Sequence, residues 1–388
     1  MKICMISYSE PHDSRVLRYI MALRSRGDEV DFVCLSSSVA PFQLRDPQVR
    51  IYPIYKRKYS EQSPLGYFRN LIFFFFRSFY FVSLLYFKNR YHVLHFHNIP
   101  DFGIFCTVIP KWFGSAKVIL DIHDLVPEFY MQKFHVSEKH WAIRILKWIE
   151  QCACRYADHV ITVTEIWRDR LIHRSVPEKK CTVILNAPDR TLFKPLPKSS
   201  PPQKGFWLSY HGNLSEHSGV DVLLKAFSQV VLKIPQVYLQ ILGHPEKIKP
   251  YLNWIQSPLV RDHVYFVPSV PVTEIPRYLR YIDVGIDPKK EGIYSGETLS
   301  VKAMEYLALE IPLIVSATPA AKHYFKDTMV RFFRPNDPED LARCIGELYQ
   351  SPSLRKKLQR EGKLFFEQHD WEKYKVRYFS LLDRFIHE

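Results

Sequence analysis

Two glutamates and a lysine lie close together in a segment whose pattern predicts a strand, a loop, a helix and a second strand. Ser300 is a suitable N-cap for a helix over about residues 301–309. Because Glu297 and Glu305 are eight positions apart, they would point about 80° apart if both lay inside one helix. With Glu297 in the loop and Glu305 in the helix, both can face one ligand. Lys302 then shares a helix face with Glu305.

This combination of residue types suits a ligand with phosphate and hydroxyl groups. A helix N-terminus next to a lysine attracts a diphosphate, because backbone amides and the cation both favour negative charge. A carboxylate one turn deeper can accept hydrogen bonds from ribose hydroxyls. The segment is therefore a plausible nucleotide-sugar site, although a surface helix with an ordinary lysine–glutamate pair has the same spacing.

The wider motif resembles the signature of the family-four retaining glycosyltransferases, which have the GT-B fold. The resemblance rests on the E-x7-E pattern from Glu297 to Glu305 and on the following letters EYLALEIPLIVS. It implies that Glu297 lies at the donor sugar, that Lys302 lies at the phosphates and that Glu305 holds the ribose. It implies further donor-binding positions in the loop and first helical turn, at Thr298, Leu299, Ser300 and Val301.

A second block follows the predicted strands 93–97 and 117–122, which end in polar clusters as expected at the carboxyl edge of a parallel sheet. The pattern HxHN-PD … D-HD-PE resembles the same glycosyltransferases, in the branch found in surface-polysaccharide biosynthesis. The resemblance implies that His123 is catalytic and approaches the donor sugar. It also implies an acceptor side lined by His97, Asn98, Asp101, Asp124 and Glu128.

The residues of this block also have plainer interpretations. His97 reads equally well as a strand end and Asp101 as a helix cap. Zinc is conceivable at the histidines, but no pair has the i,i+4 spacing of a helical zinc site, and we expect no metal.

The second half of the chain contains a glycine-containing turn and loop, HGNLSEHSGVDVLLKAF, which resembles the donor-phosphate loop of the family. Gly212 and Gly243 are positions where the backbone can approach a ligand closely. His217 occupies the place where relatives carry a basic residue, and a neutral imidazole is a weaker phosphate ligand than arginine. Val270 lies in VPSVPVTEIP, which resembles the segment that packs on the nucleobase.

The first 35 residues predict a β-α-β opening of a doubly wound sheet. No G-x-G-x-x-G follows the first strand, and the chain has 13 glycines, which argues against a dinucleotide oxidoreductase. The segment EPHDSRVLRYIMALRSRGDEVDFVC resembles the opening of the same glycosyltransferases. This resemblance implies phosphate contacts by Asp13 or Arg15, whereas the residues by themselves read as a helix cap and a surface arginine.

The chain length of 388 residues and the 47% apolar content suit two domains. We expect the α/β class and the GT-B fold, with two Rossmann-like doubly wound domains and an interdomain cleft. The predicted parts are an N-terminal acceptor-binding domain (1–190), a linker (191–205), a nucleotide-sugar-binding domain (206–370) and a terminal helix crossing back to the first domain (371–388).

The formal charge of +14 indicates an anionic partner. No nucleic-acid-binding motif is present, and we expect no nucleic acid.

Residues 71–87 are strongly apolar and aromatic, but Arg77 near the centre costs about 2.5–3.5 kcal/mol on insertion scales, and the run is short for a span. We therefore predict a helix and loop lying on an anionic membrane, with an aromatic core helix as the alternative. The basic residues that favour the membrane are Lys56, Arg57, Lys58, Arg69, Arg77, Lys88 and Arg90, against Glu61.

Seven scattered cysteines indicate free thiols in a reducing compartment. No signal peptide is evident at the N-terminus. The predicted location is cytoplasmic, peripheral on the inner face of the cell membrane.

The predicted activity is retaining transfer of a sugar from a nucleoside-diphosphate sugar to a hydroxyl of a glycan or lipid-linked acceptor, in surface polysaccharide or glycolipid assembly. No cofactor is expected beyond this co-substrate. Two alternatives stay open: a non-hydrolysing sugar-nucleotide epimerase of the same architecture, and a basic binding module without catalysis.

Overall fold

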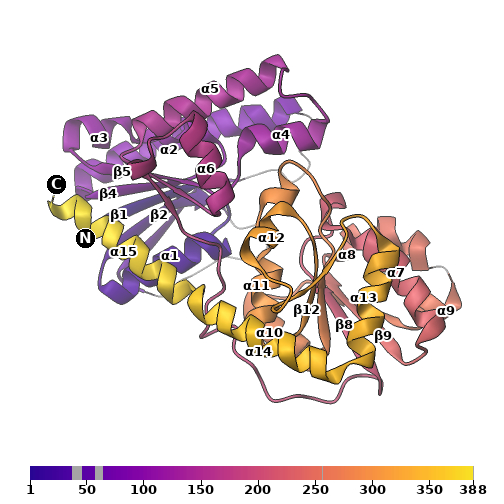
Figure 1. The fold of residues 1–388 in the computed structure, drawn as a ribbon. Coiled ribbons are helices and arrows are strands. Elements are labelled where there is room, and N and C mark those ends of the chain that lie inside the picture. The colour runs from indigo at the N-terminus through magenta and orange to yellow at the C-terminus, as the bar shows by residue number, and fades with distance from the viewer. Residues whose placement is uncertain (37–45, 57–63, 256, 388) are drawn as a thin grey trace. The chain divides into compact units, whose positions relative to one another are not determined.

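The computed structural model describes residues 1–36, 46–56, 64–255 and 257–387, and the chain divides into two compact α/β units (Figure 1). Unit 1 comprises Met1–Leu185 and Lys375–Glu388, and unit 2 comprises Asn186–Tyr374. The first division falls a few residues before the predicted linker. Each unit alternates strands with helices along the chain.

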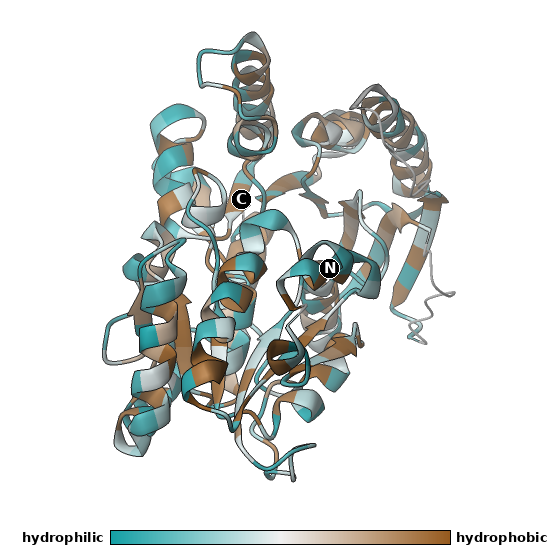
Figure 2. Ribbon diagram, turned by 90° about the vertical axis from the view of Figure 1, so that its right-hand side faces the viewer, coloured by the Kyte–Doolittle hydropathy of each residue, from teal (hydrophilic) through white to brown (hydrophobic). Residues whose placement is uncertain are grey.

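Unit 1 contains, among its described residues, a sheet of seven parallel strands. The strand order reverses between β1 and β4, as in a doubly wound sheet. The central strands are buried on both faces, so their sequences are nearly continuous apolar runs, and hydrophobic colour dominates the strands in Figure 2. In sheet order the strands are β3 (Val49–Tyr55), β2 (Glu29–Leu35), β1 (Lys2–Ser7), β4 (Val93–His97), β5 (Lys117–Ile122), β6 (His159–Thr162) and β7 (Cys181–Val183).

Helices cover both faces of this sheet. Figure 1 shows α2, α3 and α5 on one face and α1 and α15 on the other. On the first face, the 3-10 helix η1 contacts both α2 and α5, and α2 also contacts α3. The helices are α1 (Ser14–Arg26), α2 (Pro64–Asn89), η1 (Asp101–Thr107), α3 (Val108–Gly114), α4 (Val126–Phe134), α5 (Trp141–Tyr156) and α6 (Glu165–Arg174).

The terminal helix α15 (Trp371–His387) begins in unit 2, and its residues from Lys375 onwards belong to unit 1. There the hydroxyl of Tyr378 lies 3.0 Å from Nδ1 of His95. The covalent chain thus returns to its first unit through one helix.

Helix α2 is long and apolar enough, by length and composition, to cross a membrane. One face of α2 nevertheless belongs to the core of unit 1, because Leu71, Phe74, Val82 and Tyr86 are buried, and the helix contacts β3 and η1. This packing fits the core helix that was the alternative prediction for α2, and its contact with a membrane surface stays a prediction. Three of the residues used to predict that membrane contact, Arg57, Lys58 and Glu61, lie outside the described part of the chain.

The described part of unit 2 has a second parallel sheet, with six strands in the corresponding order. Its strands are β10 (Val264–Pro268), β9 (Val237–Gly243), β8 (Phe206–His211), β11 (Val284–Asp287), β12 (Leu313–Ser316) and β13 (Arg331–Phe333). Its helices are α7 (Val220–Lys233), α8 (Pro245–Ile248), α9 (Pro258–Arg261), α10 (Ile275–Leu279), α11 (Val301–Ala308), α12 (Pro319–Tyr324), α13 (Pro338–Gln350) and α14 (Pro352–Gln368).

Candidate functional site

Polar side chains gather in unit 2 where the strand order reverses, between β8 and β11. His211 ends β8 and Asp287 ends β11, and both side chains are about 1% exposed. Helix α11 begins near this edge, and the Ser300 side chain accepts a hydrogen bond from the backbone of Ala303. Ligands of open α/β sheets bind at such a switch point, so the fold places this cluster at the expected binding edge.

Glu305 is held by His211, which was predicted only as part of a turn. Its Oε2 lies 2.6 Å from Nε2 of His211, and the residue is 6% exposed. The imidazole ring packs edge-on against Tyr306, with ring centroids 4.7 Å apart. The Glu305 carboxylate, which was predicted to hold the ribose, is therefore fixed in one orientation by His211 at the end of β8.

Lys302 extends to the end of β11, where its Nζ lies 3.3 Å from Oδ1 of Asp287. Burial by itself would lower the pKa of Lys302, but the Asp287 carboxylate, together with Tyr210 and Glu305, outweighs burial and raises it. Gly212 has a φ of 114°, and a Cβ at this position would lie 3.1 Å from Cδ of Lys302. The glycine thus allows both the left-handed turn and the passage of the lysine.

A second lysine, Lys289, lies in the same cluster and was not identified from the sequence. Its Nζ donates a hydrogen bond to the carbonyl of Thr298 at 2.9 Å and another to the hydroxyl of Thr298. Burial lowers the pKa of Lys289 to about 8, with Asp287 opposing the shift and Lys302 adding to it. Asp287 therefore pairs with Lys302 and also attracts the charge of Lys289.

His217 contributes little positive charge to this cluster. Burial lowers its pKa, and the charges of Lys289 and Lys302 lower it further. Its Nε2 lies 3.0 Å from the hydroxyl of Ser215. The imidazole stays neutral and can offer a phosphate one hydrogen bond, while the lysines supply the charge.

The other predicted donor-side residues lie in the same unit. Glu297 ends the 3-10 helix η6 (Ser295–Glu297) and lies outside α11, as expected for a helix that begins after Ser300. Gly243 ends β9, and Val270 lies half-buried in the loop after β10. Thr298, Leu299, Ser300 and Val301 lead half-buried from η6 into α11.

In unit 1, the position of Arg15 corrects both interpretations drawn from the sequence. Asp13 caps α1, as the residues alone indicate, with its Oδ1 3.0 Å from the backbone nitrogen of Arg15. The Arg15 side chain is neither on the surface nor at a phosphate, because the residue is 4% exposed. Its Nε and Nη2 donate to the two carboxylate oxygens of Asp121, each at 2.9 Å. A buried bidentate pair thus joins α1 to β5.

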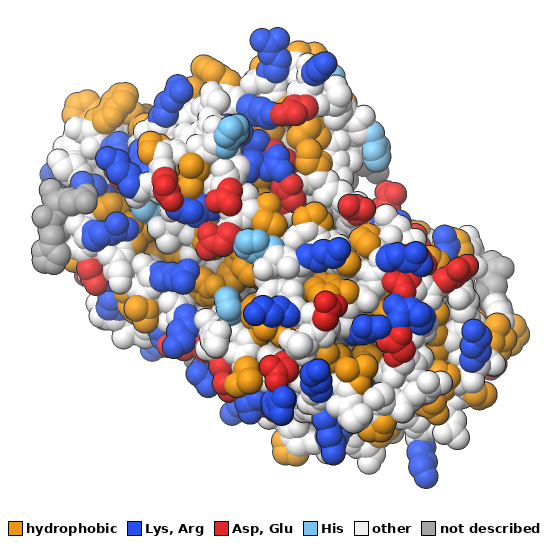
Figure 3. Space-filling model, in the orientation of Figure 1, with side chains coloured by type: hydrophobic (Ala, Val, Ile, Leu, Met, Phe, Trp, Pro, Cys, Tyr) orange, Lys and Arg blue, Asp and Glu red, His pale blue; other side chains and the backbone are white. Residues whose placement is uncertain are grey.

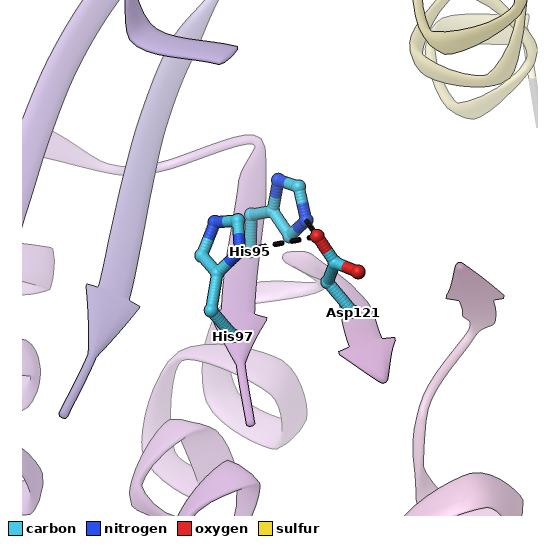
Figure 4. Close-up of side chains that lie close together, drawn as sticks. All are labelled: His95, His97 and Asp121. Atoms are coloured by element: carbon cyan, nitrogen blue, oxygen red, sulfur yellow. Dashed lines mark ion pairs between the residues drawn. The ribbon is translucent and has the colours of Figure 1, made fainter. Parts of the chain in front are cut away.

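Two histidines of β4 flank this pair (Figure 4). His97 Nδ1 lies 3.1 Å and His95 Nε2 lies 3.8 Å from Oδ2 of Asp121, and the two rings stack with centroids 4.2 Å apart. The nitrogen and oxygen atoms of the three side chains lie within 4.8 Å of one another, as in a metal site. However, the Arg15 guanidinium already occupies both Asp121 oxygens, and its charge opposes a second cation there. The cluster is better explained as a buried structural pair with neutral imidazoles.

These imidazoles make the folded state sensitive to mild acid. Burial lowers the pKa of His95 and His97 in the folded protein, whereas the unfolded chain binds their protons below about pH 6.5. The unfolding free energy should therefore fall as the pH drops below 6.5, by up to about 1.4 kcal/mol per pH unit for each histidine. Urea unfolding between pH 7.5 and 5.5 measures this slope. His95→Gln cannot titrate and should have a shallower slope, and an identical slope in the variant would contradict the assignment.

His123 and Asp124 follow β5 in a loop fixed by Asn98. The Asn98 Oδ1 accepts hydrogen bonds from the backbone nitrogens of His123 at 3.1 Å and of Asp124 at 3.3 Å. Its Nδ2 donates to Asp101 at 2.9 Å and to the carbonyl of Asp124 at 2.6 Å. His123 and Asp124 are half-buried, so both keep a surface through which a ligand can be reached.

Four other residues predicted for the acceptor side are buried and bonded within unit 1. His97 is fully buried, Asn98 is 2% and Asp101 is 4% exposed, and all three bond within unit 1. Both Glu128 carboxylate oxygens accept hydrogen bonds from Arg174, at 2.5 and 3.0 Å, and the residue is fully buried. These contacts hold the loop and its surroundings in place, and contact of the four residues with an acceptor stays a prediction.

The predicted site residues thus form two clusters. The donor-side residues lie together in unit 2, and His123 and Asp124 lie in unit 1. The meeting of the two clusters in one site stays a prediction.

Two family models match successive parts of the chain. A model described as "Glycosyl transferase 4-like domain" matches residues 13–187, and one described as "Glycosyl transferases group 1" matches residues 195–365. An uncharacterised glycosyltransferase of Haemophilus influenzae is 22% identical, with 91% of this chain and 90% of that protein covered. A chitobiosyldiphosphodolichol beta-mannosyltransferase of Debaryomyces hansenii is 24% identical, with 71% of this chain and 64% of that protein covered.

Solved structures agree on the fold. Sucrose-phosphate synthase of Thermosynechococcus elongatus has a TM-score of 0.79 at 18% identity, with 100% of this chain and 99% of that chain covered. HepE of Anabaena in complex with UDP-glucose has a TM-score of 0.73 at 15% identity, with 99% and 100% covered. With a glycosyltransferase model over each half and two doubly wound parallel sheets, the chain belongs to the family-four glycosyltransferases and has the GT-B fold.

Proposed function

We propose that the protein transfers a sugar, with retention of anomeric configuration, from a nucleoside-diphosphate sugar to an acceptor hydroxyl. The observation that carries this proposal is the pair of contacts at the switch point of unit 2, where His211 orients Glu305 and Asp287 orients Lys302. A carboxylate for ribose and a cation for phosphate thus stand one helical turn apart. The UDP and UDP-glucose complexes of HepE support a nucleotide-sugar donor.

The leaving diphosphate is stabilised by charge that is already in place. Lys302, Lys289 and the N-terminus of α11 direct positive charge toward one strand edge. Glu297, at the end of η6, serves the donor sugar, and Val270 serves the base. The reaction proceeds by front-face displacement, in which the leaving phosphate accepts the proton of the acceptor hydroxyl.

The acceptor side belongs to the loop after β5, with His123 at the donor sugar and Asp124 next to it. We propose a glycan or lipid-linked acceptor in surface polysaccharide or glycolipid assembly. The Debaryomyces hansenii relative is named as a chitobiosyldiphosphodolichol beta-mannosyltransferase, and this name supports the proposal of a lipid-linked acceptor. The protein works in the cytoplasm at the inner face of the cell membrane, and needs no cofactor or metal.

The proposed function is tested in two steps. UDP-, GDP- and ADP-sugars are first compared by thermal stabilisation, because a ligand at about 100 times its Kd adds roughly 2.7 kcal/mol of stability. The best donor, labelled with carbon-13 at its anomeric carbon, is then incubated with and without a lipid extract from the source cells. A product with the donor's anomeric configuration supports retention. An inverted product contradicts retention, and an epimerised donor formed without acceptor favours the epimerase.

Lys289 gives the proposed donor site a distinct pH dependence. Because its pKa is about 8, it loses its charge as the pH rises through 8, and kcat/KM for the donor should fall in the same range. Lys289→Met should lower kcat/KM at pH 7 by about 10–100-fold and remove this alkaline decline. Lys289→Arg should keep most of the activity and move the decline to higher pH. Lys290→Met is the matched control, since Lys290 pairs with Asp221 at 2.9 Å. An unchanged profile in Lys289→Met would refute the assignment.

A further inference from the structure

The helices on one face of the unit 1 sheet turn aromatic side chains toward solvent. On α2, the exposed residues Phe73, Phe76, Tyr80, Leu84 and Phe87 recur every three or four positions, so they form one stripe opposite the buried face of the helix. Helix α2 is thus apolar on its solvent-exposed side as well as on its buried side.

The neighbouring helices continue the pattern. Trp112 and Phe113 of α3 are 70% and 78% exposed, and Trp141 and Trp148 of α5 are 68% and 63% exposed. Ile145 lies between the two tryptophans on the same face of α5. Because α2 contacts α3 and η1, and η1 contacts α5, these stripes belong to one layer of helices. We call this surface the aromatic face.

The exposed charge around the aromatic face is predominantly positive. Over residues 66–156, all of them described, the one exposed acidic side chain is Glu138, and it pairs with Lys147. The other acidic residues of this range are buried, apart from half-buried Asp124. Figure 3 shows hydrophobic side chains at the upper left, where Figure 1 places α3, with basic ones beside them. The exposed basic residues of this range are Arg69, Arg77, Lys88, Arg90, Lys133, Lys139, Arg144 and Arg155.

We propose that the aromatic face docks on an anionic lipid bilayer, with the aromatic side chains inserted at the headgroup level and the basic side chains on the phosphates. Tryptophan, tyrosine and phenylalanine favour this interface, and neighbouring lysine and arginine supply the attraction to anionic lipid. On α5, Arg144 and Arg155 share the exposed side with Trp141 and Trp148, as expected if their long stems extend toward headgroups. The bilayer contact thus comprises α3 and α5 as well as α2, and does not depend on the proposed sugar transfer.

Vesicle sedimentation tests this docking surface directly. The full-length protein should sediment with vesicles of phosphatidylcholine and phosphatidylglycerol at low salt, and much less with phosphatidylcholine alone. The triple variant Trp112→Ser/Phe113→Ser/Trp148→Ser should bind the anionic vesicles at least about tenfold more weakly. Arg144→Glu/Arg155→Glu should weaken binding in the same direction. These residues are exposed, so near-UV dichroism and the melting temperature should show that both variants are folded.

A matched control distinguishes binding by the aromatic face from non-specific binding of exposed apolar residues to vesicles. Leu232, Leu252 and Trp254 of unit 2 are exposed apolar residues, at 69%, 43% and 43%, and their triple serine variant should bind vesicles like the wild type. Equal recovery in the supernatant with and without vesicles would overturn the proposal, as would equal binding by wild type and the Trp112 triple variant. Loss of a dimer in that variant, without vesicle binding by the wild type, would instead assign the face to a second copy of the chain.

Discussion

Lys302→Met is expected to lower kcat/KM for the nucleotide sugar by about 10²–10³-fold, the usual effect of removing one group that stabilises developing charge. The physical reason is the position of its Nζ at the β11 edge, where Asp287 keeps the lysine charged at neutral pH. Because the charge acts on the leaving diphosphate, kcat should fall more than KM rises. Steady-state kinetics with the donor found in the screen measures both constants.

A second effect of this variant must be separated from the first. Removing Lys302 takes away the ion-pair partner of the buried Asp287 carboxylate, which is 1% exposed and keeps the through-space attraction of Lys289. Breaking a buried pair by removing one partner destabilises a fold by about 3–5 kcal/mol. Lys302→Met/Asp287→Asn removes both charges and should restore most of the melting temperature while staying inactive. If the double variant regained transfer activity, Lys302 would be a structural residue and its proposed catalytic role would fail.

Arg15→Met is expected to be the most destabilising single change in unit 1, by about 3–5 kcal/mol. The guanidinium joins α1 to β5 through two hydrogen bonds to Asp121, and both side chains are almost fully buried. Without the guanidinium, the Asp121 carboxylate stays buried next to the neutral imidazoles of His95 and His97. Thermal unfolding should show a fall in melting temperature of roughly 10 °C.

The pH dependence of the stability lost in Arg15→Met identifies the cause of that loss. Burial alone would raise the pKa of Asp121, but Arg15 and His97 hold it well below the ordinary value. The pair thus contributes stability above about pH 4, and this contribution is lost as the pH falls further. The difference between wild type and Arg15→Met should shrink accordingly in acid.

Two further variants complete the test of this buried pair. Arg15→Met/Asp121→Asn should recover more than half of the lost stability, because no unpaired charge remains in the interior. Arg168→Met, which breaks the exposed pair with Glu178, should cost at most about 1 kcal/mol. Equal losses in Arg15→Met and Arg168→Met would mean that the Arg15–Asp121 pair contributes no more than a surface contact.

Local features of the sequence predicted much of the fold and part of the donor site. Ser300 caps α11 as its residue type indicates, and this predicted helix start correctly placed Glu297 before α11 and Glu305 within it. The strand pattern predicted β4 and β5 at their observed bounds. These features follow from interactions within a few residues, which the order of side chains encodes directly.

What the sequence did not determine were the partners of buried charges. Arg15 read as a surface residue, yet its partner Asp121 is 106 positions away, and Glu305 pairs with His211 across 94 positions. Likewise, Lys289 was not identified from the sequence, and the sequence did not indicate that Arg174 would hold Glu128. In each case the packing of strands and helices brings distant groups into a region without water, where charges must pair. Spacing along the chain therefore determined which elements form, and tertiary packing decided which polar groups are exposed to a ligand and which only support the fold.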